Sequence, residues 1–234
     1  MALINKAYNA LKNVFQKHNR NFITPDEYID GCKYVQNKAI RQSFDFLNNI
    51  KNNSKVGRVV KVDYDKERFY KDVVRKLLSS ETLTYNAVSE TFELPSDYSL
   101  CQSIYYSGNE VEEISNDERF ISNLPEIAVD DVYPIYLIGS TDIEIIPDTI
   151  ISGVKMYYYR QPNDPKWTYV EVSGKPVFDA DQVDFQDFEL PDSIYDEIIR
   201  ELALYFALEL KQPDVYSAMD KKENESEQIK RSNQ

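Results

Sequence analysis

The residue types that most often carry catalysis are scarce in this chain of 234 residues. It has a single histidine, His18, which lies beside Asn19 and Arg20 and belongs to no recognisable motif. A catalytic triad, a histidine-ligated metal or a histidine general base would all depend on that one side chain. The 40 Asp and Glu residues allow so many carboxylate pairs that no pair stands out. We therefore expect a protein that is not an enzyme.

Motifs for phosphate and metal binding are also missing from the sequence. There are only 6 glycines, and none of the patterns GxGxxG, GxxxxGK[ST] or GxSxG occurs. Residues 179–187, DADQVDFQD, invite comparison with a calcium loop. Val183 stands where a third oxygen ligand would be needed, and no glycine turns the loop. We expect no metal and no cofactor.

Charge is distributed unevenly along the chain. Residues 1–76 hold 16 Lys and Arg against 8 Asp and Glu, a net charge of +8, whereas residues 77–234 hold 11 against 32, a net charge of −21. A basic segment of this kind can contact nucleic acid. Within residues 51–76 the candidate contacts are Lys55, Arg58, Lys61, Arg68 and Arg75.

Two observations weaken the nucleic-acid interpretation. Four acidic residues interrupt the basic segment, and the acidic majority of the chain would repel phosphates. Opposite charges on two parts of one chain also suit head-to-tail packing of identical subunits. An ordinary solvated surface is the third interpretation.

Tyrosine is unusually frequent, with 18 residues beside 11 phenylalanines and one tryptophan. Its large, rigid ring with a polar tip suits half-buried and interface surface, although AT-rich codon usage would give the same bias. The cluster Tyr157-Tyr158-Tyr159-Arg160 could stack on bases, but alternation along a strand favours core and subunit contacts. The candidate subunit contacts are Tyr157, Tyr159, Arg160, Trp167 and Tyr169.

Helical periodicity appears at both ends of the chain. Helices are predicted over residues 3–17, from Thr24 to about residue 50, over 64–79, and within the stretch 188–216, where Asp192 or Ser193 should cap the start. Thr24-Pro25-Asp26-Glu27 is a capping box that should start the second helix. The last helix is apolar on nearly every side over residues 202–208, which predicts burial on several faces. Its expected core positions are Ile194, Ile198, Leu202, Tyr205 and Leu208.

Between residues 82 and 178 the helical spacing of apolar residues gives way to a pattern typical of short strands and turns. Hairpins are predicted at Ser107-Gly108-Asn109, at Gly139-Ser140-Thr141 and at Ser173-Gly174-Lys175, and a short helix capped by Asn116-Asp117. After Pro213 the sequence turns polar, which is typical of a loose tail or of a segment that orders on a partner.

These elements predict an α+β fold in which a helical bundle carries an inserted antiparallel β domain. The expected divisions are N-terminal helices over residues 1–80, the β domain over 81–190, the last bundle helix over 191–212 and the polar tail over 213–234. No apolar run is long enough to span a bilayer, and the first nine residues lack the apolar core of a signal peptide. Cys32 and Cys101 are expected to be free thiols in a reducing cytoplasm.

A series of short motifs in the second half of the chain is similar to a known family. Phe92 to Tyr98 reads FELPSDY, a strand with a Gly108 turn follows, and a hairpin ends at Pro147. The strand VKMYYYRQP comes next, and Leu190-Pro191-Asp192 opens the late helix. In order and spacing, residues 90–216 resemble the head-to-tail connector, or adaptor, proteins of tailed bacteriophages, including those of short-tailed and crAss-like phages. The acidic stretch between Trp167 and Leu190 departs from that pattern.

The resemblance implies a structural virion protein at the head–tail junction, made in the cytoplasm of the host bacterium. Such adaptors form a neck ring, usually of twelve copies, beneath the portal protein. They extend the channel through which DNA passes during ejection, without binding it specifically, and they dock the next ring or tail protein. The implied partners are therefore a sister subunit, the portal and a tail-side neighbour, with no membrane. The polar tail, represented by Tyr216, Met219, Lys221 and Lys222, is the expected portal contact. The alternative is a DNA-binding or packaging accessory protein that uses residues 51–76.

Overall fold

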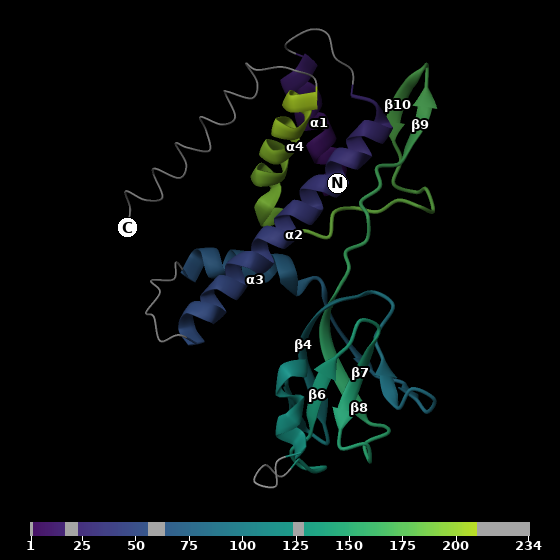
Figure 1. The fold of residues 1–234 in the computed structure, drawn as a ribbon. Coiled ribbons are helices and arrows are strands. Elements are labelled where there is room, and N and C mark those ends of the chain that lie inside the picture. Colours follow the sequence, from purple (N-terminus) through teal and green to yellow (C-terminus); the bar gives the residue numbers. More distant parts are fainter. Residues whose placement is uncertain (1, 17–22, 56–63, 124–128, 210–234) are drawn as a thin grey trace. The chain divides into compact units, whose positions relative to one another are not determined.

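The chain folds into two compact units, which we describe separately (Figure 1). The computed structural model describes residues 2–16, 23–55, 64–123 and 129–209, with backbone alone for 51–55 and 120–123. Residues 1–76 and 162–234 form the helical unit, and residues 77–161 form the β unit. The fold is α+β, with helices at both ends of the chain and a largely antiparallel sheet inserted between them, as the sequence predicts.

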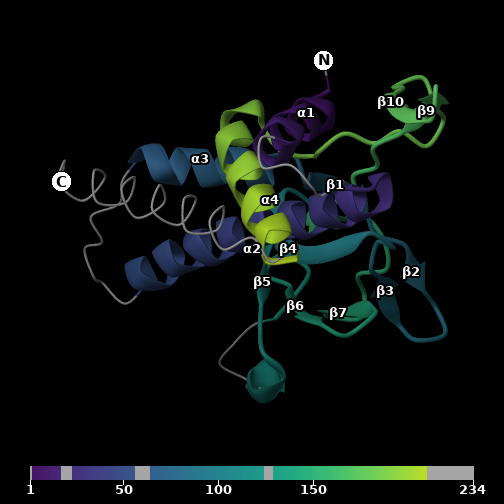
Figure 2. The same ribbon diagram turned by 90° about the horizontal axis from the view of Figure 1, so that it is seen from above.

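Four α-helices make up the described core of the helical unit. They are α1 (Leu3–Gln16), α2 (Pro25–Lys55), α3 (Tyr64–Arg75) and α4 (Tyr195–Glu209), the last preceded by the short 3₁₀ helix η2 (Asp192–Ile194). Helix α4 packs against α1 and α2, and α3 packs against α2 (Figures 1 and 2). The predicted apolar stripe of α1 is confirmed as buried and consists of Ile4, Ala7, Tyr8, Leu11 and Phe15.

Helix α2 begins at the predicted capping box. The Glu27 carboxylate accepts hydrogen bonds from the Thr24 backbone N–H and hydroxyl, both at 2.8 Å, and the Glu27 N–H donates to the Thr24 hydroxyl at 3.3 Å. These reciprocal bonds satisfy donors that the first turn of a helix otherwise leaves unpaired. The helix start was therefore encoded locally and is confirmed.

Two helix predictions need correction. Leu208 does not belong to the core stripe of α4, because its side chain is 65% exposed while Ile198, Leu202 and Phe206 are buried. The apolar run 202–208 is thus buried on one side only. The third helix ends at Arg75 and not at residue 79. Leu78 and Ser79 pair instead with Tyr159 and Tyr158, so strand pairing overrides the helical pattern there.

The β unit contains one sheet of eight strands in the order β1-β8-β4-β5-β6-β7-β3-β2. The neighbours are antiparallel except β5 and β6, which run parallel. One sheet face carries the core, whose fully buried members include Phe92, Ile104, Ile143, Val154 and Met156. The strands are β1 (Leu78–Thr82), β2 (Tyr85–Asn86), β3 (Thr91–Glu93), β4 (Tyr98–Tyr106), β5 (Asn109–Glu113), β6 (Ile135–Ile138), β7 (Asp142–Ile146) and β8 (Val154–Arg160).

The predicted turns of the sheet are confirmed. The β4–β5 hairpin turns at Ser107 and Gly108, whose φ angles are 49° and 88°, as a tight hairpin requires. Strands β6 and β7 form the second hairpin. The short helix is the 3₁₀ helix η1 (Asn116–Asn123), but its cap is Ser115, whose hydroxyl and N–H donate to Glu118.

The β unit is shorter than the domain expected over residues 81–190. It ends at Gln161, and the third hairpin, β9 (Tyr169–Val172) with β10 (Lys175–Phe178), belongs to the helical unit (Figure 1). Trp167 explains this division. Its side chain is buried against Tyr8 and Tyr28, with ring centroids 4.3 and 6.1 Å away, and its Nε1–H donates to Asn5 at 3.3 Å.

Candidate functional site

The most distinctive surface of the β unit is the side of its sheet opposite the core. Along β8, Val154, Met156 and Tyr158 are buried, so strand alternation places the intervening side chains on the other side. Residues that are paired across antiparallel strands share a face, which adds positions from β1 and β4. We call this surface the outer tyrosine face. It consists of Leu78, Ser80, Thr82, Leu100, Ser103, Tyr105, Lys155, Tyr157 and Tyr159.

A shallow hollow of about 480 Å³ lies in the outer tyrosine face. Its apolar lining comes from Leu78, Tyr105 and Tyr157, and its polar lining includes Gln102 and Ser103. The rings of Tyr105 and Tyr157 meet edge to face at 5.7 Å, which holds both in place. The hollow therefore combines a preformed apolar floor of these three side chains with polar groups elsewhere in its lining.

Lys155 supplies the positive charge of this hollow. Its ammonium nitrogen lies 5.0 Å from the centre of the Tyr157 ring, a cation–π arrangement, and it has no carboxylate partner in the described part of the chain. The β unit has only 3 Lys and Arg against 15 Asp and Glu, a net charge of −12. Arg119 of the same unit pairs with Glu144, whereas the Lys155 ammonium remains available to a negatively charged partner.

The predicted subunit contacts fall in different places. Tyr157 and Tyr159 lie on the outer tyrosine face. Arg160 lies on the opposite face of the sheet, the one that also carries Met156 and Tyr158. Trp167 lies in the core of the helical unit with 1% exposure, so its side chain is not available to a sister subunit in this structure. Tyr169 is 37% exposed at the start of β9 and stacks on Trp167 at 5.6 Å.

The basic residues proposed for nucleic-acid contact are only partly described. Arg58 and Lys61 lie outside the described residues, and so does the side chain of Lys55. Arg68 and Arg75 are exposed on α3, where Arg75 faces Asp72 at 3.6 Å and Lys71 faces Glu67 at 2.5 Å. The described part of this segment is therefore a surface of alternating charges. The expected portal contacts Tyr216, Met219, Lys221 and Lys222 also lie outside the described residues, as does His18.

The acidic stretch 179–187 forms an ordered loop, a role that sequence reasoning missed. The Asp179 carboxylate accepts hydrogen bonds from the Asp181 N–H at 3.0 Å and from the Gln182 side chain at 2.9 Å, which lowers the pKa of Asp179. Asp184 forms an ion pair with Lys166, and the hydrogen bond lowers the pKa of Asp184. Val183 stands at the tip with its side chain fully exposed.

At the end of the same stretch, Asp187 caps the first helix of the chain. Its carboxylate accepts hydrogen bonds from the backbone N–H groups of Leu3 and Ile4, both at 2.8 Å, and from that of Phe188 at 2.9 Å. A carboxylate at a helix N-terminus satisfies unpaired donors and complements the helix dipole. No local pattern predicts such a cap, because its partners are 183 and 184 positions away.

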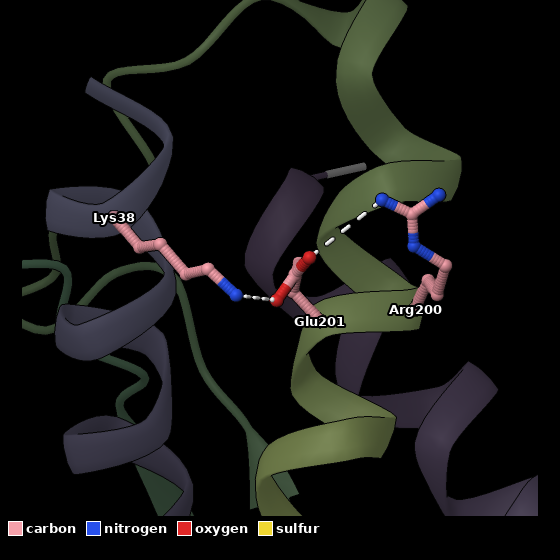
Figure 3. Close-up of polar contacts among 3 residues, drawn as sticks. All are labelled: Lys38, Arg200 and Glu201. Carbon is pink, nitrogen blue, oxygen red and sulfur yellow. Dashed lines mark hydrogen bonds and ion pairs between the residues drawn. The ribbon is translucent and has the colours of Figure 1, made fainter. Parts of the chain in front are cut away.

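A group of charged side chains joins α2 to α4 in the helical unit (Figure 3). The Glu201 carboxylate lies 2.5 Å from the Lys38 ammonium and 3.6 Å from the Arg200 guanidinium. The three side chains line a small cavity of about 80 Å³ together with residues of α3 such as Phe69 and Tyr70. The cavity is too small for an ordinary organic substrate, so we interpret this group as a structural link between the two helices.

The buried titratable groups of both units are neutral structural residues. Burial raises the pKa of the Cys32 thiol and, together with nearby Cys32, that of Tyr28, whose hydroxyl donates to the Ile4 carbonyl at 2.6 Å. Burial also raises the pKa values of Cys101 and Tyr136 in the β unit. Across the described ranges, no cluster of three or more His, Cys, Asp or Glu residues is placed to hold a metal ion. No described helix is long and apolar enough to cross a membrane.

Comparison with known proteins adds no assignment. No protein-family model matches the chain, and no curated protein matches it significantly. The functional argument therefore depends on the residues and surfaces described above.

Proposed function

We propose that the protein is a head–tail adaptor of a tailed bacteriophage, a structural component that forms a ring beneath the portal. The observation that carries the proposal is the ordered motif series over residues 90–216. Its members coincide with element boundaries: Leu94-Pro95 follows β3, Pro147 follows β7, and the YYRQP motif ends β8. Leu190-Pro191-Asp192 leads into η2 and α4. Each motif is therefore positioned where it would shape the fold.

Three further features support a role in assembly. The outer tyrosine face presents large, rigid side chains of the kind that interfaces favour. The basic N-terminal segment and the β unit of net charge −12 are complementary, which suits a heterologous contact that repeats around a ring. An acidic body also suits a channel through which DNA must slide, since cationic contacts would retain it. In this proposal the partners are sister subunits, the portal and a tail-side protein.

Light scattering of the purified protein, alone and mixed with the portal protein of the same phage, tests the proposal. We expect the mixture to contain a complex larger than the portal by several copies of the 27.3 kDa chain. Cryo-electron microscopy of that complex should show a ring on one end of the portal. A chain that stays monomeric in both samples, and that is absent from purified virions, would overturn the proposal. A salt-titrated DNA-binding assay on the same sample addresses the alternative that uses residues 51–76.

A further inference from the structure

In the helical unit, an apolar side chain, Val183, stands exposed at the tip of the loop over residues 179–187. Val183 has a relative exposure of 105%, the highest of the large hydrophobic residues in the described ranges. Exposed valines are ordinary, but this one stands on a loop that internal contacts hold in shape. The Phe185 N–H donates to the Gln182 carbonyl at 3.1 Å, and the Phe185 ring meets Phe178 edge to face at 5.6 Å. The loop is thus preorganised, so little ordering entropy would be lost on binding.

The loop tip is negatively charged, and not all of its carboxylates are bonded to other groups of the chain. Asp179 and Asp184 are engaged by the bonds already described. The carboxylate of Asp181, by contrast, is exposed and contacts no other group among the described residues, although its backbone N–H is bonded. The tip therefore offers one apolar side chain next to one available carboxylate.

The hollow of the outer tyrosine face has the complementary features. Its floor of Leu78, Tyr105 and Tyr157 is apolar, and its volume of about 480 Å³ readily accepts a valine side chain. Lys155 in its lining is the one cation of the outer tyrosine face and has no ion-pair partner in the described ranges. Glu110, which is paired with Tyr105 on the neighbouring strand β5, lies on the same side of the sheet and would disfavour a second carboxylate there.

From this match we propose that the loop tip of one copy docks in the hollow of the next copy, with Val183 on the tyrosine floor and Asp181 facing Lys155. The inference rests on the proposed ring and specifies its subunit contact. Because the loop and the hollow are different surfaces, the contact is heterologous and can repeat from copy to copy until a ring closes. One such contact is an anchor within a larger interface, in the way that a few central residues dominate binding energy.

Charge reversal in two separate variants tests the contact. In Lys155→Glu alone, the introduced carboxylate would meet Asp181 of the next copy, and in Asp181→Lys alone, the introduced ammonium would meet Lys155. We expect each variant by itself to need a concentration at least about tenfold higher than the wild type to form rings on the portal, because attraction becomes repulsion. An equimolar mixture of the two variants should recover assembly, since in a ring of alternating copies every contact again pairs a carboxylate with an ammonium.

The mixture also separates this contact from one within a single chain, which could not be rescued by a second copy. Val183→Asp should weaken assembly about tenfold, while the control Val88→Asp, at a position 96% exposed on the turn between β2 and β3, should leave it unchanged. The emission of Trp167 and the circular dichroism spectrum confirm that each variant is folded.

Three results would overturn the inference. The first is assembly of both charge variants as readily as the wild type, and the second is failure of the mixture to assemble better than either variant alone. The third is a Val183→Asp ring that forms as readily as the wild-type ring. If the wild-type chain itself forms no ring with the portal, the proposed function falls, and this contact falls with it.

Discussion

At the residue scale, Asp187 joins the start of the chain to a segment near its end. Its carboxylate accepts three backbone hydrogen bonds, two of them from the first turn of α1. Because the acidic stretch 179–187 ends in this cap, at least one of its acids is structural and is not available to bind a metal. The same stretch holds Asp179 and Asp184, whose bonds shape the loop.

Replacing Asp187 should destabilise the helical unit specifically. We expect Asp187→Ala to lower the free energy of unfolding by about 1–2 kcal/mol, since it leaves partly buried N–H groups of α1 unpaired. Asp187→Asn should keep most of the stability, because an amide oxygen also caps a helix. Urea unfolding followed by Trp167 emission measures the effect. Asp181→Ala is the matched control, and an equal loss in that variant would contradict the assigned role.

The capping box of α2 should give the stability a small dependence on pH. Hydrogen bonds from the Thr24 N–H and hydroxyl lower the pKa of Glu27 from its ordinary value of 4.5. The carboxylate therefore contributes stability above about pH 4.5, and the contribution is lost as the pH falls through the folded-state pKa. In urea unfolding between pH 3 and 6, the difference between the wild type and Glu27→Gln should shrink as the pH falls. A constant difference would be inconsistent with this assignment.

At the element scale, the contact of α2 with α4 depends on a glycine. A Cβ atom at Gly31 would lie 2.9 Å from the ring of Phe206 and 3.3 Å from that of Tyr205. Phe206 is buried and meets Phe15 edge to face at 6.4 Å, so its ring has little room to move. The two helices thus approach closely where a small residue permits it.

Gly31→Ala sets two effects against each other. Alanine favours a helix over glycine by about 1 kcal/mol, while overpacking a rigid core costs about 1–3 kcal/mol. We expect a net loss of about 1 kcal/mol in urea unfolding, because the obstructing atoms belong to a buried ring. In a Phe206→Leu background the same substitution should become neutral or stabilising. A stabilising effect in the wild-type background would show that the helices are further apart.

The elements that sequence reasoning predicted well are those with local causes. The buried stripe of α1 follows from the helical spacing of its apolar residues. The start of α2 follows from the Thr24–Glu27 capping box, and the β4–β5 turn from Ser107-Gly108. The failures have distant causes. The strand β1 forms because β8 pairs with it, and residues 162–190 join the helices because Trp167 packs on Tyr8 and Tyr28.

The same distinction applies to the candidate site. Tyr157 and Tyr159 were predicted as interface residues, and alternation along β8 places them on one face. The hollow beside them could not be predicted, since residues of β1, β4 and β8 line it and the pairing of β4 with β8 shifts register between Tyr98 and Leu100 and again between Cys101 and Ser103. The exposed tip at Val183 was interpreted only as a break in a calcium pattern.

At the scale of the whole molecule, each unit contains one cysteine that can report on it. Cys32 is buried in the helical unit, and Cys101 is half-buried in the β unit. Burial raises the pKa of both thiols, so both should react slowly in the folded protein at about pH 8.

Pulsed alkylation in increasing urea should therefore follow the two units separately. Each unit has its own core, so we expect Cys32 and Cys101 to become reactive at different urea concentrations, with a singly labelled species between them. Mass spectrometry of the peptides identifies which thiol is labelled. Simultaneous labelling of both at every concentration would show that the units unfold as one.

The insertion of the β unit within the helical unit has a consequence for synthesis. The first and last strands of the β unit are neighbours, and the Arg160 N–H donates to the Leu77 carbonyl at 2.9 Å. The complete sheet can therefore leave the ribosome and form before Trp167 and α4 have emerged. At about 5–20 residues per second, the apolar stripe of α1 and the buried face of α2 would wait on the order of ten seconds for their partners. During that interval the nascent chain has a folded sheet, while the apolar faces of α1 and α2 still lack their partners. These exposed faces are then the surfaces that a chaperone would bind.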